Sequence, residues 1–187
     1  MIDNCNKIFN SYKIDIVINM ACNMGGIGFI EWNKAKCMIS VLINTHMLMA
    51  CEKYNIKKYF FSSSACAYNQ DLQNNTFVEG LREKDAYPAM PEDGYGWEKL
   101  FSERMCRHFT EDFGLETRVV RYHNVYGPRM GFKHVIPHLV QRFRNNENPF
   151  KIYGHDQTRS FNFIDDAVEG TVKAMESGKN GEIYHIG

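Results

Sequence analysis

The chain has 187 residues, of which 44% are hydrophobic, enough to build one packed domain or most of one. Its 22 basic and 22 acidic residues balance, and its apolar stretches are interrupted before they could span a bilayer, so neither a nucleic acid nor a membrane is expected as a partner. The six cysteines form no Cys-x-x-Cys pair and no metal-ligand spacing, which predicts reduced thiols in a cytoplasmic protein and no metal site.

Strand and helix patterns alternate from the start of the chain. Two apolar, β-branched runs at 13–21 and 57–64 predict buried parallel strands. Between them, residues 31–54 carry apolar side chains at helical spacing, which predicts one long crossover helix. A second helix is predicted over 93–113, with its cap near Asp93.

The alternation continues to the last residues. A long loop is expected at 69–91. The remaining predicted elements are a strand at 115–122, a helix at 136–143, a strand at 160–164, a helix at 166–175 and a strand at 182–186. Together these elements indicate an α/β fold, a Rossmann-like doubly wound parallel sheet.

One part of a Rossmann domain is not found. Such a domain opens with a strand, a glycine-rich turn and a helix whose N-terminus holds a pyrophosphate. Gly25, Gly26 and Gly28 follow the first strand, but they lead into a Trp-bearing segment and are not that fingerprint. We therefore expect residues 1–187 to form a single partial NAD(P)-binding domain that lacks the N-terminal glycine-rich unit. Residues 128–160 are expected to contribute to a small substrate-binding lobe.

Tyr95 and Lys99 are the first candidate catalytic residues. They lie four positions apart on a predicted helix, so the ammonium group sits one turn from the phenol on the same face. A free phenol has a pKa of about 10, so a lysine charge and an oxidised nicotinamide ring are both needed to favour phenolate at neutral pH. Ser64, at the end of a predicted strand, can hydrogen-bond the same hydroxyl. Alone, the Tyr-x-x-x-Lys pair is typical of many surface helices, and Ser64 favours the functional interpretation.

Five segments carry a family resemblance across most of the chain. They are 24–30 (MGGIGFI), 63–68 (SSACAY), 93–100 (DGYGWEKL), 123–128 (HNVYGP) and 157–165 (QTRSFNFID). At these segments the sequence resembles the extended short-chain dehydrogenase/reductase family, the NAD-dependent epimerases and dehydratases, and within it most of all the 3,5-epimerases that act on GDP-mannose. The resemblance implies NAD as cofactor, with NADP as an alternative, a nucleotide-sugar substrate with GDP-mannose favoured, and a homodimer.

The resemblance also implies a role for each matching residue. Ser64 would touch a sugar hydroxyl, Tyr95 would take its proton, and Lys99 would hold the nicotinamide ribose and lower the pKa of Tyr95. It further implies cofactor contacts at Ala21, Ser62 and His123, sugar contacts at Gly25, Gly26 and Asn124, and a clamp on the substrate pyrophosphate at Arg159.

Cys66 distinguishes epimerisation from dehydration. By the same resemblance, the related 4,6-dehydratases carry acid and base carboxylates at this strand end. Ser64 and Cys66 provide no carboxylate. A thiol here resembles the proton-transfer residue of the epimerases, and its pKa can be brought toward neutrality by local charge. His134 is the expected second proton carrier, with Lys133 as its substitute, because the segment at 134–137 resembles that of GDP-fucose synthase.

Other interpretations of these residues remain open. Cys66 also fits a small buried thiol, and His134 fits a polar cap at the start of a helix. At the level of function, the alternatives are another nucleotide-sugar epimerase, an epimerase-reductase like GDP-fucose synthase, or a non-catalytic protein that binds a dinucleotide. Proteins of the last kind typically lose the tyrosine and lysine, so the presence of Tyr95 and Lys99 argues against it.

Overall fold

Four parallel strands form the central sheet of the chain. The computed structural model describes residues 2–74 and 80–187, so part of the loop predicted at 69–91 lies outside the described residues. The strands, in spatial order, are β1 (Ile16–Asn19), β2 (Lys58–Ser64), β3 (Glu116–Tyr122) and β6 (Ile183–Ile186). Each of them lies within a run predicted to be a strand.

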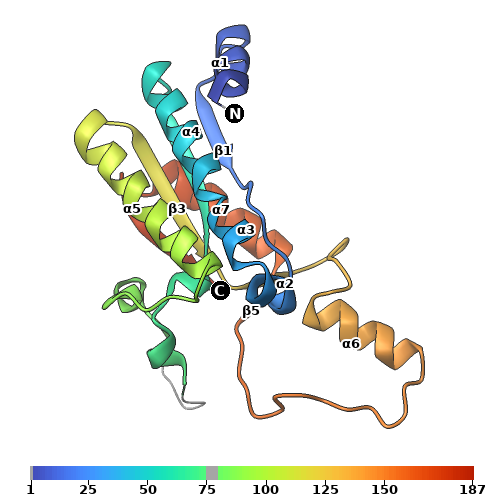
Figure 1. Cartoon of the computed structure of the whole chain (residues 1–187). Helices are drawn as coiled ribbons and strands as arrows, with labels where there is room; N and C mark the ends of the chain where they lie inside the picture. The colour runs from blue at the N-terminus through green and yellow to red at the C-terminus, as the bar shows by residue number, and fades with distance from the viewer. Residues whose placement is uncertain (1, 75–79) are drawn as a thin grey trace.

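Helices cover both faces of this sheet (Figure 1). α4 (Val41–Lys53) and α5 (Tyr95–Phe113) lie on one face, and α7 (Ile164–Ser177) lies on the other. α1 (Ile2–Ser11) packs beside α4, where the strands begin. This arrangement confirms the predicted Rossmann-like doubly wound sheet. None of the helices within the described ranges is long and apolar enough to cross a membrane.

A smaller sheet lies beyond the main one. β4 (Asn124–Tyr126) pairs in parallel with β5 (Phe161–Phe163), and only the second of these was predicted. Between them in sequence, α6 (Val135–Arg144) and the exposed stretch that follows it extend away from the layers (Figure 1). The 3-10 turn η1 (Ala65–Ala67) follows β2 directly, and the loop predicted at 69–91 contains two more, η2 (Gln70–Gln73) and η3 (Glu83–Ala86).

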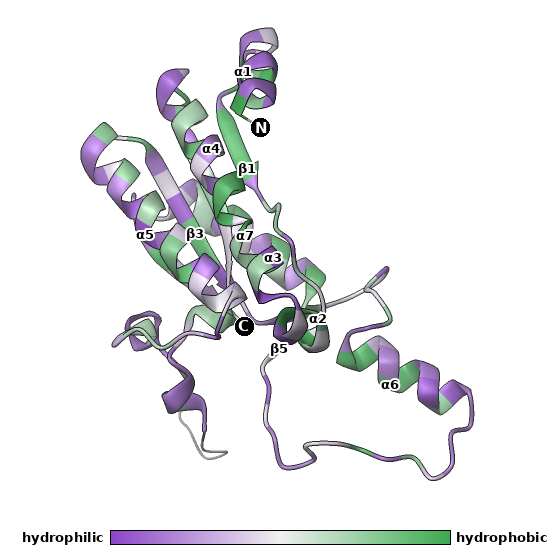
Figure 2. Cartoon of the chain, in the orientation of Figure 1, coloured by the Kyte–Doolittle hydropathy of each residue, from purple (hydrophilic) through white to green (hydrophobic). Residues whose placement is uncertain are grey.

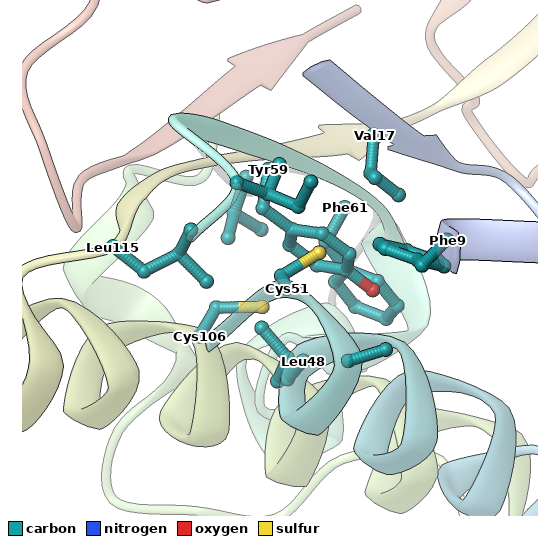
Figure 3. Close-up of a cluster of buried hydrophobic side chains, with 11 residues drawn as sticks. Phe9, Val17, Leu48, Cys51, Tyr59, Phe61, Cys106 and Leu115 are labelled. Carbon is teal, nitrogen blue, oxygen red and sulfur yellow. The ribbon is translucent and has the colours of Figure 1, made fainter. Parts of the chain in front are cut away.

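The main core lies between the sheet and the helices α4 and α5 (Figure 3). Phe61 of β2, Leu48 of α4 and Cys106 of α5 are each at most 1% exposed and belong to one cluster. Phe9 of α1 joins the same cluster. Burying a side chain of this size contributes about 1.5–3 kcal/mol, so this cluster fixes how α5 lies on the sheet.

The prediction that β1 is buried is only half correct. Val17 and Asn19 face the core, but Ile16 and Ile18 are 47% and 53% exposed, although Figure 2 shows β1 as an apolar strand. The reason is that β1 lies at the edge of the sheet, while α7 packs against β3 and β6 at the other end.

The single helix predicted at 31–54 is wrong. The stretch contains the end of α2 (Ile27–Trp32), then α3 (Lys34–Met38), and only then α4. Asn33 separates α2 from α3, and its side-chain amide donates to the Phe29 carbonyl. Ser40 precedes α4, and its hydroxyl accepts a hydrogen bond from the Asn23 amide at 2.7 Å. These polar contacts turn the chain where apolar periodicity alone suggests continuity.

The helix that carries Tyr95 also begins later than predicted. α5 starts at Tyr95, and its capping residue is Gly94, whose φ of +131° is a conformation that residues with a side chain rarely adopt. Asp93 does not cap the helix, because its carboxylate instead lies 2.7 Å from the Lys34 ammonium.

A buried ion pair joins β3 to α5. Arg121 is fully buried, and its Nε and Nη2 atoms donate to the two carboxylate oxygens of Glu103 at 2.8 and 2.6 Å. Ser63 of β2 donates to the same carboxylate at 2.5 Å. Arg121 also donates to the Glu83 carbonyl at 2.6 Å and stacks on the Tyr68 ring. One carboxylate therefore connects two neighbouring strands and the helix above them.

We predict that Glu103→Ala lowers the free energy of unfolding by about 3–5 kcal/mol, because it leaves the Arg121 charge buried without a partner. Urea denaturation measures this change. The control is Glu111→Ala on the same helix, which breaks an exposed ion pair with Arg107 and is expected to leave stability nearly unchanged. Equal effects of the two substitutions would contradict this account of the pair.

Candidate active site

The ends of the parallel strands bring most of the predicted site residues to one edge of the sheet. Ala21 follows β1, Ser64 ends β2 and His123 follows β3. Because the strands are parallel and in register, with Ser64 opposite Tyr122, these residues share the carboxyl edge. Ligands of doubly wound sheets bind outside this edge.

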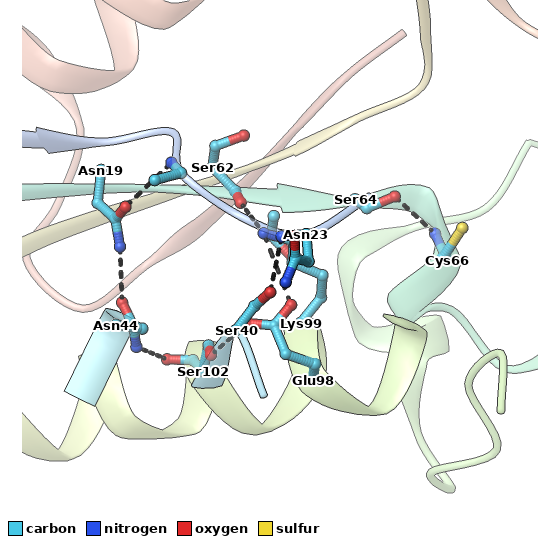
Figure 4. Close-up of polar contacts among 12 residues, drawn as sticks. Asn19, Asn23, Ser40, Asn44, Ser62, Ser64, Cys66, Glu98, Lys99 and Ser102 are labelled. Carbon is cyan, nitrogen blue, oxygen red and sulfur yellow. Dashed lines mark hydrogen bonds and ion pairs between the residues drawn. The ribbon is translucent and has the colours of Figure 1, made fainter. Parts of the chain in front are cut away.

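Lys99 is buried against β2 near the carboxyl end of that strand (Figure 4). Its side chain comes from α5, and the residue is 1% exposed. The ammonium donates to the Ser62 carbonyl at 2.9 Å and lies 4.7 Å from the centroid of the Phe61 ring and 5.4 Å from that of Tyr95. The predicted shared face of Tyr95 and Lys99 is confirmed.

Tyr95 is surrounded by apolar and thiol side chains. It is 5% exposed and packs in a cluster with Ile30 and Cys37, which Cys22 and Cys66 also contact. Burial raises the pKa of its phenol well above the ordinary value, and the nearby thiols add to that effect. The Ser64 hydroxyl acts in the opposite direction through hydrogen bonding. The Tyr95 pKa is therefore not lowered, contrary to the expectation for a phenol beside Lys99, and the protein's own groups keep the phenol protonated.

Cys66 lies directly after the strand that ends in Ser64. It is part of η1, and its backbone amide donates to the Ser64 hydroxyl at 3.2 Å (Figure 4). Burial raises the pKa of the thiol, while Ser64 and Lys99 partly oppose this. The expectation of a near-neutral thiol is therefore wrong, because loss of solvent dominates over local charge. At neutral pH this thiol carries its proton.

Gly96 holds Cys66 against the start of α5, a role that the sequence analysis missed. A Cβ atom at Gly96 would overlap the Cys66 carbonyl oxygen. The same carbonyl accepts from the Glu92 amide at 3.1 Å, and the Glu92 carboxylate accepts from the Gly96 amide at 2.8 Å. A glycine inside a helix is unfavourable by about 1 kcal/mol relative to alanine, and this was the signal that could have found it.

The glycine segment meets the loop that leads to α6. A side chain at Gly26 would come within 2.8 Å of the Lys133 carbonyl, and one at Gly25 would come equally close to Phe29. The absence of side chains here lets two backbones approach each other. His134 precedes α6, and its amide donates to the Gly131 carbonyl at 3.1 Å. In the described part of the chain, no recorded hydrogen bond or ion pair joins Lys133 or His134 to Cys66 or Tyr95.

Asn124 begins β4 of the smaller sheet, and Arg159 lies two residues before β5. The Asn124 side-chain amide donates to the Ser160 carbonyl at 2.9 Å, which ties β4 to the residue before β5. Arg159 is exposed, and its guanidinium donates to the Thr158 carbonyl and to the Gln157 side chain. The parallel pairing of β4 and β5 thus places Asn124 opposite Phe161, and Arg159 lies two residues before that position.

His123 belongs to an aromatic cluster that the sequence analysis did not foresee. Its ring stacks on His185 with centroids 4.1 Å apart, and His185 in turn contacts the Tyr68 hydroxyl at 2.9 Å. Burial, with a smaller contribution from His185, lowers the pKa of His123 to about 4. The neutral ring has a buried Nε2 atom without a hydrogen-bond partner among the described residues. Such an atom at a strand end is suited to meet a polar ligand.

Comparison with known proteins finds a family that matches the whole chain. The model of the NAD dependent epimerase/dehydratase family matches residues 1–187. Over 183 residues, the chain is 42% identical to GDP-mannose 3,5-epimerase 1 of Oryza sativa subsp. indica and 38% identical to GDP-mannose 3,5-epimerase of Arabidopsis thaliana. Each match covers 95% of this chain and 48% of the relative. The chain therefore spans about half the length of the curated relatives it matches.

Solved structures of sugar-nucleotide enzymes share the fold. UDP-glucose 4-epimerase of Thermotoga maritima, solved with UDP-glucose, has a TM-score of 0.84 at 26% identity, over 100% of this chain and 59% of that one. UDP-glucuronic acid 4-epimerase of Bacillus cereus, solved with UDP-glucuronic acid and NAD, has a TM-score of 0.82 at 27% identity, over 100% and 58%.

We predict that Gly96→Ala lowers the free energy of unfolding by about 1–3 kcal/mol, because the added methyl group must displace the Cys66 carbonyl. The matched control is Gly28→Ala in α2, where a Cβ atom meets nothing within 4 Å. That substitution is expected to be neutral or to stabilise by up to about 1 kcal/mol. Thermal or urea unfolding distinguishes the two, and a Gly96→Ala protein as stable as the control would refute the close contact.

Proposed function

We propose, because the chain belongs to the NAD dependent epimerase/dehydratase family, that the protein is an NAD-dependent nucleotide-sugar epimerase with GDP-mannose as its favoured substrate. The observation that carries the proposal is the buried Lys99 ammonium beside Tyr95, next to Ser64 and Cys66 at the carboxyl edge of the sheet. Similarity to the plant GDP-mannose 3,5-epimerases supports the choice of substrate.

The residues at this edge fit the nicotinamide half of NAD. The Lys99 ammonium has donors beyond the one that Ser62 accepts, and His123 offers a buried, unpartnered ring nitrogen. Lys99 and Tyr95 would hold the nicotinamide ribose, and Ala21, Ser62 and His123 would line the ring; NADP would meet the same residues. When bound, NAD supplies reversible oxidation of the sugar at C4.

Tyr95 and Ser64 act on the sugar hydroxyl at C4. Ser64 orients this hydroxyl, and Tyr95 takes its proton once added positive charge overcomes the burial that keeps the phenol protonated. The resulting C4 ketone makes the protons at C3 and C5 acidic. Tyr95 and Ser64 then supply hydrogen-bond donors where negative charge develops on the C4 oxygen.

Cys66 and His134 exchange protons at C3 and C5, on opposite faces of the ring, with Lys133 as the substitute for His134. Because burial keeps the Cys66 thiol protonated, Cys66 is assigned to deliver a proton and His134 to remove one, and the two side chains regain their starting protonation by exchange with water before the second carbon reacts. Gly25, Gly26 and Asn124 would contact the sugar, and Arg159 would clamp the pyrophosphate. Residues 128–160 would belong to the substrate lobe, since α6 and the segment after it lie outside the main layers.

Dehydration and net reduction are the nearest alternatives. The human dTDP-D-glucose 4,6-dehydratase is 26% identical over 185 residues, but the strand end of this chain carries Ser64 and Cys66 in place of carboxylates. An epimerase-reductase like GDP-fucose synthase would consume NADPH stoichiometrically, whereas an epimerase would not. We further propose a cytoplasmic homodimer that pairs through α5, on which Trp97 and Phe101 are 40% and 55% exposed.

The test is proton exchange in deuterium oxide. We predict that the full-length protein, given GDP-mannose, incorporates deuterium at C3 and C5, and that Cys66→Ser, which lacks the assigned proton donor, slows formation of the deuterated epimers by at least about 100-fold, the scale of a missing general acid or base. NMR of the sugar follows the exchange.

The control is Cys5→Ser, which changes a thiol on α1 that contacts Met47 and lies outside the site. Equal exchange rates in both variants would remove Cys66 from the mechanism. Exchange with a different nucleotide sugar but not with GDP-mannose would change the substrate and keep the mechanism, and no exchange with any sugar would contradict the epimerase proposal.

A further inference from the structure

Glu98 places a second buried charge beside the candidate catalytic pair. It is 3% exposed, although it follows Trp97, which faces solvent. Its Oε1 atom accepts a hydrogen bond from the Ser102 hydroxyl at 3.1 Å. Its Oε2 atom lies 3.7 Å from the Lys99 ammonium and has no hydrogen-bond partner among the described residues. A buried carboxylate is unfavourable unless it is paired, so its presence here calls for an explanation.

The Lys99 ammonium has four neighbours. It donates to the Ser62 carbonyl and lies beside the Glu98 carboxylate (Figure 4). It also lies over the rings of Phe61 and Tyr95. The carboxylate therefore approaches Lys99 from the helix side, opposite the strand that carries Ser62. This arrangement limits the positions that the ammonium can take.

Besides Lys99, titratable groups from three elements act on Glu98. They are the Tyr95 phenol of its own helix, the Tyr59 phenol of β2 and the Cys37 thiol of α3. Burial raises the pKa of each of these three groups, so all three are neutral at neutral pH. Lys99 is thus the charged partner of Glu98, and Arg121 and Glu103 form a second buried pair one turn further along α5.

Further groups act on the surroundings of Tyr95 from other elements. The Cys22 thiol approaches Tyr95 from the segment after β1, and the Cys66 thiol from η1. The Glu92 carboxylate acts on Cys37 and Cys66. These groups stay the same when Glu98 is substituted, so a change in the pH profile reports the loss of the Glu98 charge.

We propose that Glu98 is a positioning residue, which holds the Lys99 ammonium between the helix and Ser62 and whose charge sets the pH above which Tyr95 works as a base. This inference rests on the proposed function, and it adds a residue to which the sequence analysis gave no role. A carboxylate beside Lys99 offsets part of the positive field that Tyr95 experiences.

The direction of the effect follows from the charges. An ionised Glu98 disfavours the phenolate and raises the pKa of Tyr95, as the neighbouring thiols also do. Burial in turn raises the pKa of Glu98 itself, opposed by Lys99 and Ser102. Replacing the carboxylate by an amide keeps the shape, removes the negative charge, and leaves Lys99 free to stabilise the phenolate at lower pH.

The test compares pH profiles of kcat/KM for epimerisation by the full-length protein and its Glu98→Gln variant. The acidic limb of the variant is expected to move to lower pH, so that at the acidic end it keeps a several-fold larger fraction of its own maximum than the wild type does. Glu111→Gln, the same substitution on the exposed part of α5, is expected to leave the profile in place. A purely structural role would lower stability and activity without moving the limb.

A second measurement does not depend on catalysis. Carboxyl-carbon NMR of the wild-type protein, with side chains assigned, is expected to show Glu98 titrating at higher pH than Glu111, whose pKa is lowered by Arg107 and His108. A Glu98 that titrates like an exposed carboxylate, or a Glu98→Gln profile that superimposes on a normal wild-type profile, would overturn the inference. A wild-type protein inactive on every nucleotide sugar would contradict the proposed function instead, and the NMR titration would still decide whether Glu98 is a buried, perturbed carboxylate.

Discussion

The buried pair between Arg121 and Glu103 is the interaction on which the candidate site depends. Arg121 lies two residues before His123, Glu103 lies one helical turn after Lys99, and Ser63, which shares the carboxylate, precedes Ser64. Each partner is therefore next to, or one turn from, a residue of the site. Buried pairs of this kind often contribute little net stability compared with an apolar replacement, but removing one partner is severe. We infer that the pair serves to fix geometry.

The electrostatics of the site follow from burial. Tyr95, Cys66 and Glu98 all have raised pKa values, because each is held away from water. Lys99, also buried, is the positive charge among them. An interior of this kind keeps the Tyr95 phenol and the Cys66 thiol protonated until a ligand brings further positive charge, so that the base is formed only when the ligand is present. That behaviour suits a reaction that must begin and end with the same protonation states.

Much of this fold can be predicted from local sequence patterns. The strands β1, β2, β3 and β6 follow from apolar runs, and the shared face of Tyr95 and Lys99 follows from helical spacing. Residues near strand ends were also predictable, because the carboxyl ends of parallel strands meet at one edge.

What sequence reasoning missed depends on contacts between distant residues. The break before α4 depends on Ser40 meeting Asn23, and the need for Gly96 depends on the Cys66 carbonyl. The raised pKa values of Tyr95 and Cys66 arise from packing that no local pattern reports. The role proposed for Glu98 was missed for the same reason. A position on a helix does not show that a carboxylate is buried until the neighbouring strand is placed.

Turnover of GDP-mannose that carries deuterium at C4 tests the central claim most directly, which is that Tyr95 and Lys99 support transient oxidation at that carbon. The account predicts that the full-length protein turns over the labelled sugar more slowly than the unlabelled one, that the product keeps its deuterium at C4, and that Tyr95→Phe abolishes turnover. Equal rates for the two sugars, with turnover surviving in Tyr95→Phe, would contradict it.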